Sequence, residues 1–256
     1  DLLEQYAALA LDKQTTLNRI TDTAAAWRVD LESGILTLGD DTFTVRCLGS
    51  YAYQSSSWLW LWANQHLKMR ADEADSAHIL REYASAHPAT ANRSGSTPLF
   101  QHPADSTLLA QERFTFDAAE LHNLAAVACG LTGADAYYLG DYGDGIALLA
   151  IHDLRVAAAW REDDTPARIL SIIPQSINLF DFNHQNAVRA YLTAKGYQLN
   201  EDAQHIRAQR ANGQITATFD DMQRLSNLSG SVALPEKSLV ARKKRQNLAV
   251  AAAVKQ

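Results

Sequence analysis

The side chains most able to do chemistry in this chain are aromatic and lie close together. The stretch YAYQSSSWLWLWAN, residues 51–64, carries three tryptophans at every second position, after two tyrosines. Alternate side chains of a β-strand share one face, so the tryptophans are expected to form a row that could stack on a sugar, a base or another planar ligand. The candidate ligand-binding residues are therefore Tyr51, Tyr53, Trp58, Trp60, Trp62 and Asn64.

The same row also fits the interior of the protein, and this is the favoured interpretation. Leu59 and Leu61 alternate with the tryptophans, so both faces of the strand are apolar, which is typical of a central strand covered on both sides. The helix expected at residues 2–20 is the natural element to cover the indoles. Asn64 is then expected to cap the turn that follows. A nucleic-acid platform would place Lys or Arg between the aromatic residues, and only Arg46 lies nearby.

Motifs for catalysis, metals and cofactors are not found in the sequence. There is no G-x-S-x-G nucleophile motif, and the serines at 55–57 are predicted to form a turn. The eight histidines form no H-x-x-x-H pair; His122 and His152 are the more suggestive ones. Residues 140–146, GDYGDGI, lack the further carboxylates of an EF-hand loop and are predicted as a hairpin tip. We therefore expect no catalytic residue, metal or cofactor.

The two cysteines, Cys47 and Cys129, lie in apolar contexts without a CxxC or Cys/His cluster. They are predicted to be buried, reduced thiols of a cytoplasmic protein. The sequence shows no secretory signal, and its apolar C-terminal stretch is too short and too rich in alanine to span a membrane. Because the chain begins without Met, the removal of an N-terminal leader stays an open alternative.

Charge is distributed unevenly along the chain. Residues 236–256 contain six basic residues and one acid, a net charge of +5, whereas the rest of the chain carries −11. An acidic body repels nucleic acid and favours basic partners, so nucleic-acid binding is expected only through this tail, if at all. Adjacent acids on solvated turns are the candidate surface for a basic partner: Glu162, Asp163, Asp164, Asp220 and Asp221.

The hydrophobic pattern predicts an α+β fold, with antiparallel β-meanders packed against about four helices. Helices are expected at 2–20, at 72–86 with Asp72 as N-cap, at 117–130 between Asp117 and Gly130, and at 183–196. Strands are expected in a four-stranded meander over 27–64, a hairpin over 136–151, a strand at 167–180 and a second meander over 197–230.

A single domain over residues 1–235 is predicted, with two sub-lobes at 1–95 and 96–235 and a basic, alanine-rich tail at 236–256. The polar stretch at 87–98 is expected to be a loop.

The tryptophan-rich stretch resembles the signature of an uncharacterised bacterial family, a domain of unknown function. Its members share a Gly-Ser-aromatic segment followed by a Trp-Leu-Trp-x-Trp-Ala-Asn run. The matching residues are Gly49, Ser50, Tyr51, Ser55, Trp58, Leu59, Trp60, Trp62, Ala63 and Asn64. The specific match covers about residues 43–66. The resemblance implies a soluble bacterial protein and assigns no activity.

Three functions follow from these observations. The first is a cytosolic protein that binds a protein partner, such as an immunity protein that neutralises a basic bacterial toxin, because complementary charge speeds encounter. The second is a small-ligand-binding protein or enzyme with a pocket beside the aromatic row. The third is a structural or regulatory module that acts through the basic tail. An enzyme is less favoured than a binding protein, since no catalytic motif is present.

Overall fold

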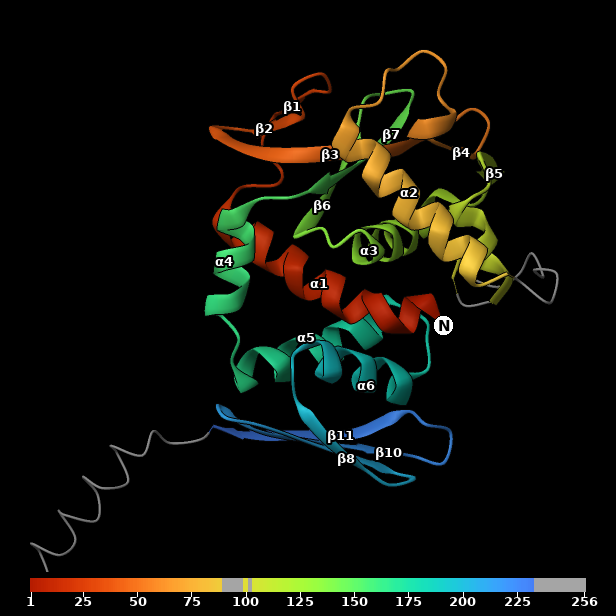
Figure 1. The fold of residues 1–256 in the computed structure, drawn as a ribbon. Coiled ribbons are helices and arrows are strands. Elements are labelled where there is room, and N and C mark those ends of the chain that lie inside the picture. Colours follow the sequence, from red (N-terminus) through yellow and green to blue (C-terminus); the bar gives the residue numbers. More distant parts are fainter. Residues whose placement is uncertain (89–98, 101–102, 233–256) are drawn as a thin grey trace, which may run out of the picture.

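The computed structural model describes residues 1–88, 99–100 and 103–232. The predicted basic tail lies outside these residues, and so does most of the loop predicted at 87–98. The described residues form six α-helices and two antiparallel sheets (Figure 1), which confirms the α+β fold class.

The first sheet contains the predicted meander. Helix α1 (Leu2–Ile20) leads into β1 (Trp27–Asp30), β2 (Ile35–Leu38), β3 (Asp41–Ala52) and β4 (Ser57–Trp60), each antiparallel to the next. Three later strands complete a seven-stranded sheet. They are β5 (Arg113–Thr115) beside β4, β7 (Gly145–Ile151) beside β3, and β6 (Ala136–Asp141) beside β7. The predicted hairpin over 136–151 is therefore confirmed.

Two helices that pack beside this sheet begin and end differently from the prediction. Helix α2 (Ala71–Ala86) has Arg70 as its N-cap, so the predicted cap, Asp72, lies in the first turn. Asp117 caps a short 3-10 helix, η3 (Ala118–Glu120), which runs into α3 (Leu121–Leu131). Gly130 does not end α3, because Gly133, with φ of 70°, follows the C-cap and supplies the left-handed residue that stops it.

The strand predicted at 167–180 is wrong. Residues Pro166–Leu179 form helix α5, with Pro174 inside it, and the unpredicted helix α4 (Leu154–Glu162) precedes it. The Thr165 hydroxyl accepts a hydrogen bond from the Arg168 N–H and caps α5, and Pro166 occupies its first turn, where the missing N–H costs nothing. The buried positions of α5 recur at helical spacing; they are Ile169, Ile172, Ile173 and Ser176.

The second sheet matches the predicted C-terminal meander. Helix α6 (His184–Ala194) is followed by β8 (Gln198–Glu201), β9 (His205–Arg210), β10 (Gly213–Phe219) and β11 (Leu225–Val232). These strands pair in chain order, each antiparallel to its neighbour. The predicted alternation of β10 is confirmed, since Ile215, Ala217 and Phe219 are buried.

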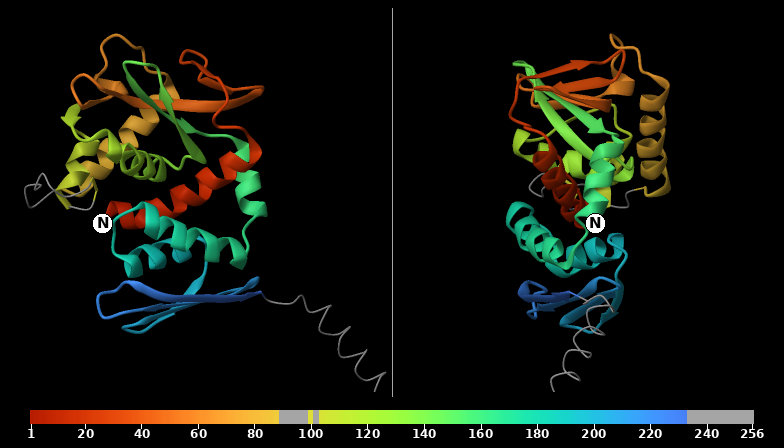
Figure 2. Two further views of the ribbon diagram at one scale, coloured as in Figure 1. Left: turned by 180° about the vertical axis from the view of Figure 1, so that it is seen from behind. Right: turned by 90° about the vertical axis from the view of Figure 1, so that its left-hand side faces the viewer.

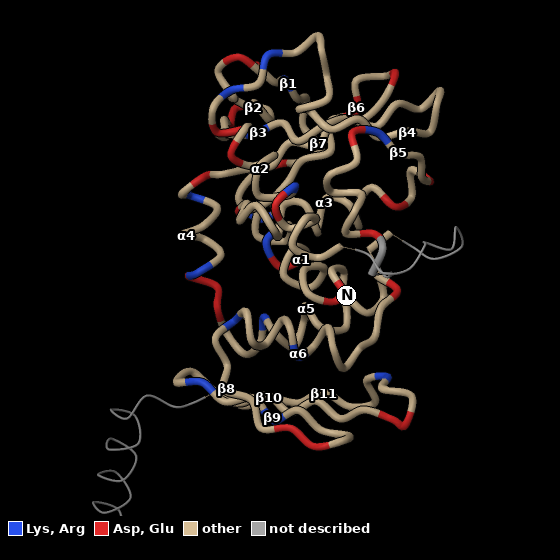
Figure 3. Tube along the Cα trace, turned by 45° about the vertical axis from the view of Figure 1, so that its right-hand side comes forward, with Lys and Arg blue, Asp and Glu red and all other residues tan. Residues whose placement is uncertain are grey.

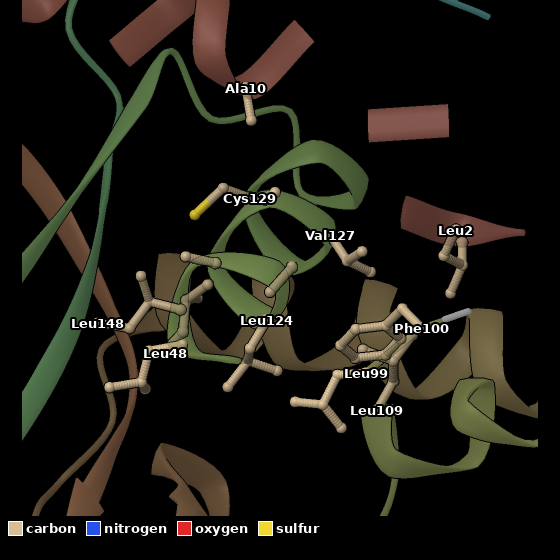
Figure 4. Packing of buried hydrophobic residues seen from close by; sticks show 14 of the residues in the cluster. Leu2, Ala10, Leu48, Leu99, Phe100, Leu109, Leu124, Val127, Cys129 and Leu148 are labelled. Carbon is tan, nitrogen blue, oxygen red and sulfur yellow. The ribbon is translucent and has the colours of Figure 1, made fainter. Parts of the chain in front are cut away.

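The elements are stacked in layers around α1. Helix α3 lies between α1 and the seven-stranded sheet, while α5 and α6 lie between α1 and the four-stranded sheet (Figures 1 and 2). In Figure 4, Leu124 and Val127 of α3 lie between Leu48 and Leu148 of the large sheet on one side and Phe100 on the other. The predicted sub-lobe boundary at 95/96 falls between strands of one sheet, because β5, β6 and β7 pair with strands that precede it.

Candidate functional site

The tryptophan row is core at its first two positions and leaves the strand at its third. Trp58 and Trp60 are fully buried and pack edge to face, with ring centroids 5.2 Å apart. The strand ends at Trp60, and Leu61–Ala63 form a 3-10 turn, η1, so Trp62 stacks flat on Trp60 at 4.8 Å instead of extending a row. The Trp60 indole N–H donates to the Leu108 carbonyl at 2.9 Å. This arrangement agrees with the favoured core interpretation for two of the three indoles.

The remaining candidate ligand residues are also dispersed. Tyr51 is buried, and its hydroxyl donates to the Phe116 carbonyl, whereas Tyr53 is exposed. The Asn64 side chain accepts the His66 N–H, which caps the turn as expected. The cluster that buries Trp58 contains residues of α2 and α3 as well as the start of α1, so the helix at 2–20 covers the row only in part.

Trp62 contributes to a groove along α2. One hollow is lined by Trp62, Met69, Ala74, Ala77 and Arg81, among others. Met69 also lines a cavity of about 550 Å³ between the β1–β2 turn, β3 and the segment before α2, whose walls include Leu31, Leu61, Leu67 and Lys68. The sequence analysis did not predict this groove. Its lining residues come from several separate segments of the chain, between residues 31 and 85, and only the fold brings them together.

The floor of this cavity is a buried ion pair, Arg70–Glu73, that completes the edge of β3. Strand β2 pairs with β3 up to residue 44 and β4 begins to pair at residue 49, which leaves a gap between them. The Arg70 guanidinium donates to the carbonyl of Val45 in the gap at 2.6 Å, and the Glu73 carboxylate accepts the Cys47 N–H at 3.1 Å. These side chains take the place of a neighbouring strand, which satisfies backbone groups that would otherwise be buried without partners.

The tip of the β6–β7 hairpin lies against the loop that joins β3 to β4. The Tyr53 N–H donates to the Asp144 carbonyl at 3.1 Å, and the Tyr53 hydroxyl donates to the Asp141 carboxylate at 3.0 Å. Tyr142 is half exposed and Tyr53 is 40% exposed. We name Tyr53, Asp141, Tyr142 and Asp144 the paired tip. Two exposed tyrosines and two carboxylates meet there, and the ion pairs of the described residues include neither acid.

The comparisons with known proteins give one match. A family model described as a family of unknown function, DUF6882, matches residues 1–154, more than half of the chain. The chain belongs to DUF6882. This confirms the expected membership of an uncharacterised family of unknown function. No curated protein and no solved structure matches the chain.

The DUF6882 region contains α1, the seven-stranded sheet, the groove and the paired tip. It stops where α4 begins, so α4 to α6 and the four-stranded sheet lie beyond the match. The two parts are joined by a buried cluster of charges centred on Asp12 of α1. Its carboxylate accepts hydrogen bonds from Arg168 and from the Trp160 indole, both at 2.7 Å, and pairs with Lys195 at 3.1 Å.

Burial alone would raise the pKa of Asp12, but the charge of Lys195 and the hydrogen bonds from Arg168, Trp160 and Lys195 outweigh it and hold the pKa below its ordinary value. Lys195 is itself almost fully buried and lies over the Trp160 ring at 4.1 Å. The carboxylate therefore stays ionised at neutral pH, and it ties the DUF6882 region to the residues that follow it.

Two of the predicted partner-binding acids belong to this cluster. Asp164 pairs with Lys195 at 2.9 Å and with Arg210 at 2.6 Å. Asp163 pairs with Arg168 at 3.4 Å and with Arg19 at 2.9 Å. Figure 3 shows this acidic run between α4 and α5, with basic residues on either side. These two carboxylates are half-buried and paired with basic residues of the same chain, which leaves Glu162 as the exposed acid of the run.

The other predicted acids lie in the turn between β10 and β11. The Asp220 carboxylate pairs with Arg224 at 2.8 Å and accepts turn N–H groups, so it shapes the turn. Asp221 accepts a hydrogen bond from Gln204. Both are available to solvent in part, and their role in binding a partner stays a prediction.

The groups weighed for catalysis and metal binding are in structural settings. Both thiols are free and buried, and burial raises the pKa of Cys47 and of Cys129 to about 12, which disfavours the thiolate. His122 makes a 2.9 Å hydrogen bond with the Tyr137 hydroxyl. Burial and the charge of nearby Arg46 lower the pKa of His152 to about 4. Within residues 1–88, 99–100 and 103–232, no three His, Cys, Asp or Glu residues are grouped to hold a metal ion.

No helix in the described ranges is both long and apolar enough to cross a bilayer.

Proposed function

We propose that this protein is a cytosolic bacterial binding protein that captures a basic protein partner through the paired tip, in the manner of an immunity protein that neutralises a toxin. The observation that carries the proposal is the meeting of exposed tyrosines and carboxylates at the paired tip. The aromatic residues of the sequence are otherwise largely committed to the core.

The chemistry of the paired tip fits a protein interface. Tyrosine is enriched at binding hot spots because its ring buries a large area at low entropic cost while its hydroxyl can still bond. Asp141 and Asp144 add negative charge that complements a basic surface and accelerates encounter. The tip is held in place by the Tyr53 hydrogen bonds to Asp141 and Asp144, so little order has to be gained on binding.

The test is direct binding to the products of neighbouring genes, each purified alone and titrated at low salt by calorimetry. A basic partner should bind the wild-type protein, and Asp144→Lys should weaken binding tenfold or more, or about 1.4 kcal/mol. Asp40→Lys is the matched control, since it makes the same charge change in the exposed turn between β2 and β3 and should bind normally. Equal loss in both variants would mean that net charge matters and the tip does not.

The immunity role has its own readout. Cells that express a neighbouring toxin should survive with the wild-type protein and die with Asp144→Lys. Unchanged toxin sensitivity in cells that express the wild-type protein would remove the immunity role. Lysine substitutions at Glu162 and Asp221 test the acids predicted from the sequence in the same assay.

A second candidate is a small-ligand-binding protein, favoured by the groove beside Trp62. Leu61, Leu67, Met69 and Lys68 line the cavity, and Trp62 lines the hollow that shares Met69 with it. This lining suits an apolar molecule that carries a negative group. A library of such compounds can be screened by tryptophan fluorescence. If the quenching disappears in Trp62→Phe, this function is supported. The four other tryptophans remain in that variant, so the loss of quenching would show that the ligand binds beside Trp62. Quenching that persists in that variant, or none at all, counts against it.

A further inference from the structure

The outer strands of the two sheets differ in how they are protected. An edge strand presents unpaired N–H and C=O groups that can pair with another chain, and native proteins shield such edges with short strands, charges, proline or a covering element. In the seven-stranded sheet, β1 has four residues and carries Arg28 and Asp30, and β5 has three residues and carries Arg113. Both edges are short and charged.

The third outer strand of that sheet, β6, is covered at its start by α1. The Gln14 side-chain amide donates to the Tyr137 carbonyl at 3.0 Å and accepts the Tyr137 N–H at 2.8 Å, as a neighbouring strand would. The Lys13 ammonium donates to the Ala134 carbonyl at 2.5 Å, just before the strand begins. Side chains of α1 therefore cover the start of this edge, and the strand ends in a charged residue, Asp141.

Among the residues that the structure describes, only one edge of the four-stranded sheet is shielded. Strand β8 has four residues and carries Glu201, which pairs with Arg189. Strand β11 has eight residues, LSNLSGSV, without a charge or a proline. Within the described residues it pairs with β10 alone, and most of its residues are exposed. It is the long, neutral edge that natural sheets avoid unless a partner covers it.

We propose that β11 pairs antiparallel with β11 of a second copy of this chain, which joins two four-stranded sheets into one of eight strands. A neutral strand can lie beside its own copy without like-charge repulsion, and the two-fold symmetric contact closes on itself as a dimer. The edge carries no acids, so it does not suit the basic partner expected at the paired tip.

Two-fold symmetry selects the antiparallel orientation. It places the Leu225 end of each β11 beside the Val232 end of the other, so the two Val232 residues lie at opposite ends of an eight-residue strand, about 27 Å apart.

The dimer leaves the paired tip free. The four-stranded sheet lies on the opposite side of α1 from the seven-stranded sheet that carries the tip (Figures 1 and 2). The inference is independent of the proposed function, because the two use different sheets. If both hold, each dimer presents two tips.

The experiment is the mass of the full chain in solution, measured by light scattering and sedimentation over a range of concentrations. The wild type is expected at twice the chain mass of 28.1 kDa. Asn227→Lys combined with Ser229→Lys puts like charges across the two-fold axis and should give monomers. Gln198→Lys combined with Gln214→Lys adds the same charge at exposed positions of β8 and β10 and should stay dimeric.

Rescue by opposite charge separates loss of pairing from loss of folding. Asn227→Glu combined with Ser229→Glu should also be monomeric, and an equal mixture of the lysine and glutamate variants should form a heterodimer. A monomeric wild type at all concentrations overturns the proposal, and so does a lysine variant that stays dimeric. A mixture that stays monomeric also overturns it.

Discussion

The Arg70–Glu73 pair and the Asp12 cluster are both buried ion pairs, but their hydrogen-bond partners lie at different distances along the chain. Arg70 and Glu73 bond to the backbone of β3 and of the β1–β2 turn, all within residues 31–73. Asp12 bonds to Trp160, Arg168 and Lys195, which lie about 150 to 180 residues further along the chain. One pair repairs a local gap in a sheet, and the other holds two parts of the molecule together.

The difference shows what buried charge can specify. A buried ion pair often adds little net stability over apolar packing, but the loss of one partner leaves an uncompensated charge and is expensive. The Arg70–Glu73 pair bonds the backbone of β3 between the residues that pair with β2 and those that pair with β4. The Asp12 cluster fixes how α1 of the DUF6882 region meets α5 and α6.

The largest effect is expected when the long-range cluster is broken. Asp12→Ala removes the carboxylate shared by Arg168, Trp160 and Lys195, and should lower the free energy of unfolding by about 3 kcal/mol or more, measured by urea denaturation. Asp163→Ala removes a more exposed carboxylate of the same cluster and should cost about 1 kcal/mol or less.

A neutral replacement sharpens this test. Asp12→Leu combined with Lys195→Met removes both charges and should recover part of the stability lost in Asp12→Ala. If the double variant is no more stable than Asp12→Ala, the cluster acts through geometry that apolar side chains cannot supply.

A smaller loss is expected for the local pair. Glu73→Ala frees the Cys47 N–H and one side of Arg70, and should cost about 2 kcal/mol. The loss is smaller than for Asp12 because Arg70 keeps Asp72 and two backbone carbonyls as partners. Hydrogen exchange should rise in β3 and α2 while β8 to β11 stay protected. Equal loosening of both sheets would contradict the local role.

The pH dependence separates the two regions. The pKa of His152 falls to about 4 in the folded protein because of burial and the charge of Arg46, with Asp72 opposing and Lys13 assisting. Protonation then favours the unfolded chain, where the pKa is about 6.5, so stability should decrease as the pH falls from about 6.5 to 4. The Asp12 carboxylate, whose pKa is lowered, should lose its contribution only below about pH 4.

His152→Gln checks the assignment of this window. The variant has no titrating ring at this position and should reduce the loss of stability between about pH 6.5 and 4, measured as the urea midpoint at each pH. Burial also lowers the pKa of His122 and of His184, so part of the loss should remain. A slope that is unchanged in the variant would assign the window to another group.

The smallest effect is expected at the paired tip. Tyr142 is half exposed, and Tyr142→Ala should change the free energy of unfolding by about 0.5 kcal/mol or less. The same substitution should weaken the binding of the proposed protein partner. A large stability loss would mean that the tip is structural and would weaken the case for an interface.

The hydrophobic pattern of the sequence predicted most helices and strands, because buried residues recur with the period of a helix or of a strand. Strand β10 alternates buried positions with more exposed ones. Helix α6 ends at Ala194, with Lys195 as its C-cap and Gly196, at φ of 75°, directly after it, as the glycine predicts. The wrong strand at 167–180 shows the limit of this reasoning. Its isoleucines favour a strand by type, but their spacing of three and four residues and the Thr-Pro start favour a helix, and packing against the second sheet follows the spacing.

For the candidate site, too, the sequence predicted some features and could not predict others. The sequence alone indicated that Trp58 and Trp60 are core, because apolar residues on both faces of a strand have to be covered. It could not indicate that Trp62 turns out of the strand, that Asp163 and Asp164 are neutralised internally, or that Tyr53 meets Asp141. The first depends on where the strand gives way to the 3-10 turn at Leu61–Ala63, which the alternating pattern does not mark. The other two depend on pairings between residues far apart in the chain, which local periodicity does not encode. Sequence fixes which faces must be buried, and tertiary structure decides which charges and rings are left to meet a partner.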